Sequence, residues 1–219
     1  MIVKICGLTH LEDAEFARNA GADVLGFICG VPESPRNNDL DSLKGIFSEL
    51  ETVKKALLFR NSKLEDVLSV LKVLKPEVVH LCGQETQTFR AKIKEIFPNI
   101  EIWQTVGVPL ENPDDSAWLE SVQGLLKEDC LKHIVLDSAK GGKAGGVGQN
   151  FPFKLVGEKL GQKQEQIIVA GGLNPNNLKE LFANIQPLGL DLSSGVEQSP
   201  GKKDFDKIED FFSNLKKVE

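Results

Sequence analysis

The sequence predicts a single α/β domain folded as a closed (β/α)₈ barrel. Short apolar runs rich in β-branched residues alternate eight times with segments of helical periodicity. The 219 residues leave about 27 for each of eight units, which is close to the shortest practical strand-plus-helix unit. An open doubly wound sheet would give the same alternation and ranks second. Because no linker or low-complexity segment divides the chain, we expect one domain over residues 1–219.

The predicted strands are short and often apolar on both faces, as buried parallel strands are. In chain order they are Ile2–Cys6, Val24–Cys29, Ala56–Phe59, Val78–Cys82, Ile100–Val106, His133–Asp137, Ile167–Ala170 and Gly189–Ser193. In a barrel of this kind, the active site lies where the strands end and the following loops begin. Candidate residues near predicted strand ends are Cys6, Cys29, Cys82, Asp137, Gly171 and Ser193.

The segments between the strands carry helix signals. Thr9 and Glu12 form a capping box that predicts a helix over Leu11–Ala20. Asn174, followed by proline, predicts a capped helix over Asn176–Asn184. Apolar residues at helical spacing predict further helices around Leu64–Leu71, Phe89–Phe97 and Phe205–Leu215.

Composition and charge narrow the function classes. The formal net charge of −6 argues against general binding to nucleic acid or to an anionic membrane, but a local basic pocket could still take a small anionic substrate. We expect no signal peptide, because the N-terminus has no long apolar stretch, and no membrane span. The four cysteines are widely spaced, without a Cys-x-x-Cys pair, which favours a cytoplasmic protein with free thiols.

Two loops near the C-terminus predict a phosphate site. Gly171 and Gly172 follow the seventh predicted strand, and Ser193, Ser194 and Gly195 follow the eighth. Glycines let backbone N–H groups approach an anion closely, and a short helix starting near Gly195 would point its N-terminus at the phosphate. Barrels of this class commonly bind phosphate between these two loops. The alternative is two ordinary turns.

A second glycine-rich stretch follows the sixth predicted strand. It covers residues 141–148 and includes Gly146. Because glycine has little local conformational preference, this stretch predicts a mobile lid over the substrate. Asp137, just before it, favours the lid over the alternative of a flexible surface loop.

Cys6 and Asp137 are candidates for a general base and a general acid. Taken singly, Cys6 could be a small buried hydrophobe and Asp137 a loop cap. Arg36, on the loop after the second strand, suits a bidentate grip on a carboxylate, although a lone loop arginine is often only solvated surface. The histidines show no metal-ligand spacing, so we expect no metal.

Sequence blocks from end to end of the chain carry a family resemblance. They are Val3-Lys-Ile-Cys-Gly-Leu-Thr9, Ser34-Pro-Arg36, Leu136-Asp137, Gly145-Gly-Val-Gly148, Ala170-Gly-Gly-Leu-Asn-Pro175 and Asp191-Leu-Ser-Ser-Gly-Val-Glu197 with Pro200-Gly-Lys-Lys-Asp204. With these blocks the chain resembles the phosphoribosylanthranilate isomerases, single-domain barrels of the ribulose-phosphate-binding type that act in tryptophan biosynthesis.

The resemblance implies a cofactor-independent Amadori rearrangement of N-(5-phosphoribosyl)anthranilate. It implies that Asp137 protonates the ribose ring oxygen, that Cys6 removes the C2′ proton, and that Arg36 holds the anthranilate carboxylate. The loop residues Gly171, Gly172, Ser193, Ser194 and Gly195 would hold the phosphate. Asp191, Cys82, His80 and Gly146 would lie near the substrate.

The chain departs from the family pattern at several positions. The usual Gln-Leu-His-Gly motif reads His80-Leu-Cys82-Gly83, so a thiol replaces an imidazole and another histidine lies two residues earlier on the same face. Leu57 replaces a glycine, Val147 replaces a threonine or serine, and the loop before Arg36 is one residue longer. These departures keep two alternatives open: a related phosphosugar isomerase or lyase, and a non-catalytic barrel that binds a phosphorylated metabolite.

Two further expectations concern a disulfide and the quaternary state. Cys6 and Cys29 end neighbouring strands, so a redox-sensitive disulfide between them is a secondary hypothesis, behind chance placement of a buried cysteine. For the quaternary state, monomers and homodimers both suit the family, and the composition favours a monomer.

Overall fold

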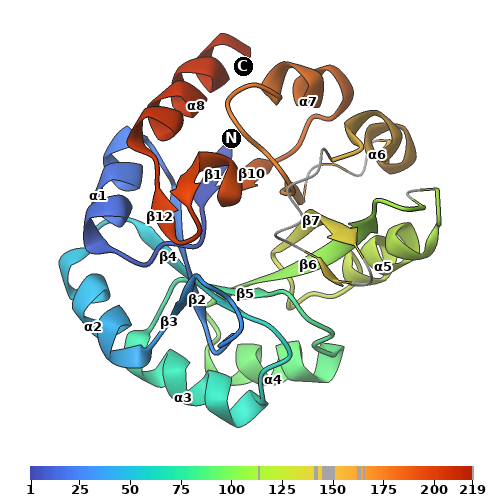
Figure 1. Cartoon of the computed structure of the whole chain (residues 1–219). Helices are drawn as coiled ribbons and strands as arrows, with labels where there is room; N and C mark the ends of the chain where they lie inside the picture. The colour runs from blue at the N-terminus through green and yellow to red at the C-terminus, as the bar shows by residue number, and fades with distance from the viewer. Residues whose placement is uncertain (113, 141–142, 145–150, 162–163, 165, 219) are drawn as a thin grey trace.

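Parallel strands close into a barrel and helices surround it (Figure 1), which confirms the predicted (β/α)₈ fold. The computed structural model describes residues 1–112, 114–140, 143–144, 151–161, 164 and 166–218. The strands follow one another around the ring in the order β1-β10-β9-β7-β6-β5-β4-β2, and pairing of β1 with β2 completes the closure. Among the described residues, no helix is long and apolar enough to cross a membrane.

The barrel strands are β1 (Ile2–Ile5), β2 (Val24–Cys29), β4 (Lys54–Phe59), β5 (Val78–Leu81), β6 (Glu101–Pro109), β7 (His133–Lys140), β9 (Ile167–Val169) and β10 (Gly189–Leu192). The helices are α1 (Leu11–Ala20), α2 (Leu40–Glu49), α3 (Leu64–Leu74), α4 (Gln87–Ile96), α5 (Ala117–Leu125), α6 (Phe153–Leu160), α7 (Leu178–Asn184) and α8 (Phe205–Val218). Short elements in the connections are β3 (Asn37–Asn38), β8 (Lys143–Ala144), the 3₁₀ turn η1 (Ser194–Val196), β11 (Glu197–Ser199) and β12 (Lys202–Lys203).

Side-chain alternation along the strands separates two apolar layers. One face of each strand packs under the helices in a large core, to which Leu25, Phe27 and Cys29 of β2 belong. The other face fills the inside of the barrel with a smaller cluster that includes Val24, Val78 and Trp103. The inside of the barrel is therefore a packed core, and open space is left for a ligand at the strand ends.

This alternation overturns the disulfide hypothesis. All four cysteines are free. Lys4 of β1 pairs with Val24 of β2, which places Cys6 beside Gly26, three residues before Cys29 along β2. Cys29 also belongs to the outer core under the helices. The two thiols are therefore separated both along β2 and across the barrel wall.

The same outer core includes Leu57. The glycine that the family usually has is thus replaced on the helix-facing side of β4, away from the inside of the barrel. Leu58, the next residue, lines the cavity at the barrel mouth instead. The Leu57 departure consequently does not alter the wall of the candidate site.

Helix α1 begins and ends as predicted, but its N-cap and the start of α7 differ from the predictions. The N-cap of α1 is His10 and has no side-chain capping hydrogen bond, because Thr9 Oγ1 donates instead to the carbonyl oxygen of Gly201. The predicted capping box is therefore wrong. Helix α7 begins at Leu178, later than predicted, because Asn174 and Asn177 donate side-chain hydrogen bonds to Gly172 O and shape the preceding loop.

Candidate active site

A cavity of about 240 Å³ opens at the carboxyl ends of the barrel strands. It gathers the site residues that the sequence predicted except Cys29 and Gly146. Cys29 belongs to the outer core instead, and Gly146 lies outside the described residues, as does most of the predicted lid. The lining residues used below are Cys6, Arg36, His80, Cys82, Thr105, Asp137, Gly171, Gly172, Asp191, Ser193, Ser194 and Gly195. They come from both ends of the chain, and the closed barrel brings them to one mouth.

Cys6 follows β1 and is buried. Burial raises the pKa of its thiol, and the Asp191 carboxylate adds to that shift. Two buried lysines oppose it: the ammonium groups of Lys4 and Lys203 attract the thiolate and lower its pKa. Cys6 is thus a thiol whose ionised form is stabilised from two sides, as a base in a closed site requires.

Asp137 lies on β7, where the strand reaches the cavity. Burial, together with the charge of Asp191, raises the pKa of Asp137 to about 7. Hydrogen bonds from Ser138 oppose this shift. A carboxyl group with this pKa is half protonated at neutral pH, so it can donate a proton to a substrate oxygen.

Asp191, on β10, lines the cavity. Its Oδ2 atom accepts a hydrogen bond of 2.7 Å from Lys4 Nζ, and the Lys4 side chain is fully buried. Burial opposes the charge on Lys4, but the attraction of Asp191 raises the pKa of Lys4 and keeps it an ammonium. The other oxygen, Oδ1, is buried and has no hydrogen-bond partner among the described residues. A buried carboxylate oxygen of this kind calls for a donor, which a ligand hydroxyl could supply.

His80 on β5 and Cys82, which directly follows this strand, point to the same inner side of the barrel, as the sequence predicted. Lys4 Nζ lies 3.0 Å from His80 Nδ1, and Thr105 Oγ1 lies 2.8 Å from His80 Nε2. Because an ammonium can only donate, we assign Nδ1 as the acceptor and place the ring proton on Nε2. Burial and the nearby Lys4 charge hold the pKa of His80 well below its usual value, so the ring is neutral.

The Cys82 thiol completes this polar group, with its sulfur 3.1 Å from Thr105 Oγ1. Burial raises the pKa of Cys82, so it stays a thiol. The departure from the family motif therefore produces a neutral imidazole and a neutral thiol beside the site. Neither adds a charge to the cavity.

The two loops that the sequence predicted to bind phosphate, after β9 and after β10, both line the cavity. Gly171 has φ = +82°, and a Cβ there would lie 2.9 Å from Asp137 Oδ1. A side chain at this position would be strained and would crowd the carboxyl group. On the facing loop, η1 begins at Ser194, which confirms the predicted short helix near Gly195 as a single 3₁₀ turn. Its first N–H groups have no partner within the turn.

Arg36 reaches the cavity past Gly7. A Cβ at Gly7 would lie 2.5 Å from Arg36 Cδ, so the glycine leaves the path of this side chain open. Arg36 is also held in an unpredicted way: its Nε and Nη2 atoms donate to the two carboxylate oxygens of Glu197 at 2.9 and 2.6 Å. Nη1 is not engaged by Glu197.

Strand pairing and hydrogen bonds from Asn37 and Asn38 hold the longer loop after β2 in place. Strand β3 pairs with the end of β2, and Asn37 Oδ1 accepts a hydrogen bond of 2.8 Å from the backbone of Val31. The Asn38 side chain is buried and donates to the carbonyl oxygens of Leu8, Ile28 and Arg36. These contacts keep Arg36 at the cavity although the loop differs from the family pattern.

Sequence reasoning missed four residues that organise the site: Lys4, Thr105, Glu197 and Lys203. Lys4 had a detectable signal, because a lysine inside a short apolar strand requires a buried partner. The other three gave none. Glu197 and Lys203 are six residues apart, but their contacts with Arg36 and Cys6 span 161 and 197 residues. Among the described residues, no group of His, Cys, Asp and Glu side chains is arranged to hold a metal ion.

Comparison with known proteins gives a consistent result. The family model described as N-(5′-phosphoribosyl)anthranilate (PRA) isomerase matches residues 3–214. A relative of that name from Crocosphaera subtropica is 33% identical, and the alignment covers 100% of both chains. A crystal structure of monomers generated from dimeric phosphoribosylanthranilate isomerase of Thermotoga maritima has 32% identity and a TM-score of 0.80, covering 99% of this chain and 100% of that one.

A further solved structure is a phosphoribosyl anthranilate isomerase in complex with reduced 1-(o-carboxyphenylamino)-1-deoxyribulose 5-phosphate. It is 31% identical to this chain, with a TM-score of 0.78, and covers 99% of this chain and 100% of that one. The similarity thus extends over the whole barrel in both sequence and fold.

Proposed function

The chain belongs to the N-(5′-phosphoribosyl)anthranilate isomerase family, and on this premise we propose how its own residues perform the isomerisation. The reaction converts N-(5-phosphoribosyl)anthranilate to 1-(o-carboxyphenylamino)-1-deoxyribulose 5-phosphate in tryptophan biosynthesis. The observation that carries the proposal is one cavity that joins a buried thiol, Cys6, to a carboxyl group of raised pKa, Asp137.

Asp137 is the general acid of the first step. It gives its proton to the ribose ring oxygen while the nitrogen lone pair opens the ring and forms a Schiff base at C1′. A carboxyl group suits this role only if it retains a proton near neutral pH, and burial beside Asp191 raises the pKa of Asp137 to about 7.

Cys6 is the general base of the second step. Its thiolate removes the proton from C2′, and the electron pair moves toward the Schiff base to give an enolamine. Tautomerisation then forms the C2′ ketone and places a proton on C1′. C2′ is oxidised and C1′ is reduced within one molecule, so the reaction needs no external oxidant, metal or cofactor.

The remaining residues hold the substrate. Arg36 takes the anthranilate carboxylate, and the loops with Gly171, Gly172, Ser193, Ser194 and Gly195 take the phosphate. The unpartnered Oδ1 of Asp191 accepts a hydrogen bond from a sugar hydroxyl. His80 and Cys82 lie near the substrate without a chemical step of their own.

A turnover assay with matched variants tests this assignment. Purified protein is mixed with freshly made N-(5-phosphoribosyl)anthranilate, and the loss of substrate fluorescence is followed. We expect Cys6→Ala and Asp137→Asn each to lower kcat on the order of 10²–10⁴-fold. Cys29→Ala removes a thiol of the outer core and should leave turnover close to that of the wild type.

The outcomes separate the alternatives. A folded wild-type protein without turnover would favour a different phosphosugar substrate or a non-catalytic binder. Near-normal turnover of either Cys6→Ala or Asp137→Asn would show that the role of that residue is misassigned.

We also propose a cytoplasmic monomer. The cytoplasm suits an enzyme of amino-acid biosynthesis whose four thiols are all free. One related protein, from Thermotoga maritima, is described as dimeric, so the monomer needs a direct test. Light scattering coupled to size-exclusion chromatography should give a mass near 24.0 kDa, and twice that mass would contradict the proposal.

A further inference from the structure

Arg36 presents an electrostatic problem as a carboxylate-binding residue. Its guanidinium is already bound in a bidentate manner to Glu197, at 2.9 and 2.6 Å. The Glu197 side chain is 3% exposed, so water screens this pair little. Together the two charges sum to zero, and a neutral pair offers little attraction for a second carboxylate.

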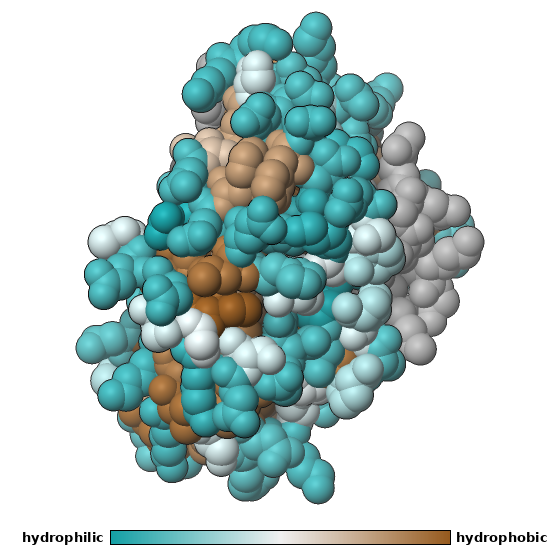
Figure 2. All heavy atoms as spheres, turned by 60° about the vertical axis from the view of Figure 1, so that its left-hand side comes forward, coloured by the Kyte–Doolittle hydropathy of each residue, from teal (hydrophilic) through white to brown (hydrophobic). Residues whose placement is uncertain are grey.

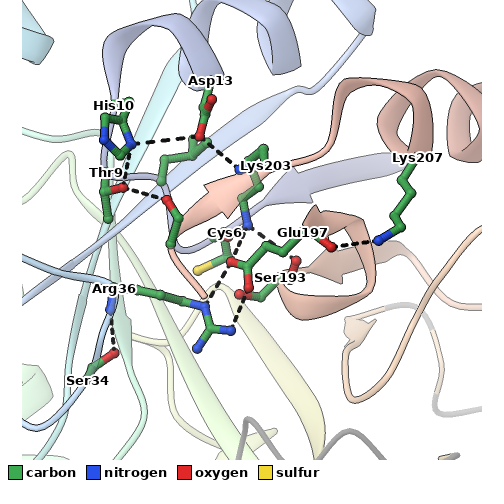
Figure 3. Close-up of polar contacts among 12 residues, drawn as sticks. Cys6, Thr9, His10, Asp13, Ser34, Arg36, Ser193, Glu197, Lys203 and Lys207 are labelled. Carbon is green, nitrogen blue, oxygen red and sulfur yellow. Dashed lines mark hydrogen bonds and ion pairs between the residues drawn. The ribbon is translucent and has the colours of Figure 1, made fainter. Parts of the chain in front are cut away.

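A third charged group completes the arrangement (Figure 3). Lys203, on β12, is buried and places its Nζ 2.9 Å from Glu197 Oε1. The same Nζ donates to the carbonyl oxygens of Cys6, at 2.6 Å, and Ser193, at 3.2 Å. These three acceptors match the three N–H donors of an ammonium, whereas a neutral amine has only two. Burial lowers the pKa of Lys203 and the Glu197 carboxylate opposes this shift. The three acceptors fit the charged form of the side chain.

We propose that Lys203 is a positioning residue for substrate binding: it compensates the charge of Glu197, so that the Arg36–Glu197–Lys203 triad carries a net charge of +1 toward the substrate carboxylate. Glu197 can then orient Arg36 without cancelling its attraction for an anion. The inference rests on the proposed function, because the carboxylate in question is that of the anthranilate ring.

The charged groups around the triad leave this sum unchanged. Asp13 is paired with Lys202 at 2.6 Å and accepts a hydrogen bond from the backbone of Lys203. Lys4 is paired with Asp191. Each of these pairs is neutral, and Glu12, which lies 3.5 Å from Lys202, is 74% exposed and screened by water. Lys203 is thus the cation that offsets the second carboxylate beside Arg36.

Lys203 also joins the parts of the site physically. Cys6 follows β1 and Ser193 follows β10, and these strands are neighbours in the barrel. One ammonium binds both carbonyl oxygens and the carboxylate that holds Arg36. The candidate base, one phosphate loop and the carboxylate clamp therefore share a common anchor.

A charge-rescue experiment tests the proposal. Isothermal titration calorimetry measures the Kd of reduced 1-(o-carboxyphenylamino)-1-deoxyribulose 5-phosphate and of the same compound without its carboxylate. Lys203→Met should weaken the carboxylate compound roughly 10- to 100-fold, as expected for a lost charge-assisted interaction. Adding Glu197→Gln to Lys203→Met restores the net charge of +1 and should bring Kd back to within about threefold of the wild type. Loss of the contacts with the Cys6 and Ser193 carbonyl oxygens weakens both compounds alike, so the compound without the carboxylate should lose clearly less affinity in Lys203→Met than the carboxylate compound.

Lys207→Met is the matched control, because Lys207 Nζ donates to the Glu197 carbonyl oxygen and not to its carboxylate. It should leave both Kd values unchanged. If Lys203→Met fails to fold, Glu197→Gln alone still tests the idea: it raises the net charge and should bind the carboxylate compound at least as tightly as the wild type.

Two results would overturn the inference alone: a double variant as weak as Lys203→Met, or equal losses for both compounds, since either would mean that Lys203 acts only through packing. A folded wild-type protein that binds neither compound would overturn the proposed function, and the inference with it.

Discussion

The reaction needs a protonated Asp137 and an ionised Cys6, but the pKa values of the two groups favour an ionised Asp137 and a protonated Cys6. Burial raises the pKa of Asp137 to about 7 and raises the pKa of the Cys6 thiol above its usual value. Between these values the pair holds one proton, and most of it resides on the thiol. The productive form, with a thiolate and a protonated Asp137, is the minor arrangement of that proton.

This ordering predicts a bell-shaped dependence of kcat/KM on pH. Activity should rise through about pH 7, where the pair loses its first proton, and fall above the usual thiol pKa of about 8.5, where it loses its second. Asp191→Asn removes a charge that raises the pKa of Asp137, so the acid limb should move to lower pH. Steady-state kinetics between pH 5 and pH 10 measures both limbs, and an unmoved acid limb would contradict the role of Asp191.

The buried carboxyl group also predicts a gain in stability for Asp137→Asn. Its pKa is higher in the folded state than in the unfolded chain, so folding is penalised as pH rises from about 4 to about 7. The variant should be more stable at pH 8 by on the order of 1–4 kcal/mol, with a smaller gain at pH 5. Urea unfolding at both pH values checks this, and a gain independent of pH would point to another cause.

At the scale of elements, the connection after β2 shows how one side chain can hold a loop. Asn38 donates to three carbonyl oxygens, one of which belongs to Arg36. Asn38→Ala leaves these acceptors without that donor and should destabilise the protein by about 1–3 kcal/mol. It should also raise the Kd of the carboxylate-bearing product analogue, while the Kd of inorganic phosphate stays the same. Equal weakening of both ligands would show a general loss of structure.

The sequence predicted the elements themselves well, because strand and helix periodicities are local properties of the chain. It failed at the N-cap of α1 and at the start of α7, where side chains have other partners. Thr9 bonds to Gly201, almost the whole chain away, and Asn177 bonds to the Gly172 loop. Local capping rules cannot anticipate such competitors.

For the site as well, the sequence predicted the local features and missed the contacts between residues that are far apart in the chain. Because side chains alternate along a strand, the sequence predicted that His80 and Cys82 share one inner face. Because active sites of such barrels lie at the strand ends, it also predicted that Cys6 and Asp137 lie at the same mouth. The partner of Arg36 could not be inferred, because Glu197 lies 161 residues further along the chain. Charge neutralisation inside a site is set by the closed fold, so sequence patterns alone do not reveal it.

At the scale of the whole molecule, the cavity exists only when the barrel is closed. The contact between Lys203 and Cys6 spans 197 residues. The first and last strands of the barrel, β1 and β10, pair with each other. Helices α2 and α3, and likewise α6, α7 and α8, by contrast contact their neighbours along the chain. Long-range closure carries a larger loop entropy than local structure and is therefore slower.

We accordingly expect refolding from urea to recover helical circular dichroism before it recovers binding of the product analogue. Stopped-flow measurements of both signals under the same conditions provide the test. Chains of this length commonly fold through intermediates. Coincident recovery of the two signals would show that closure is not a separate late step.

The route of the last helix has a practical consequence. Figure 1 places the N-terminus near helix α8 and the C-terminal end of the chain. The strands run from that side toward the cavity, so both ends of the chain lie on the face away from the mouth. A fusion partner or a solid support could therefore be attached at either end while the entrance stays open to solvent. An immobilised form should keep the KM of the free protein.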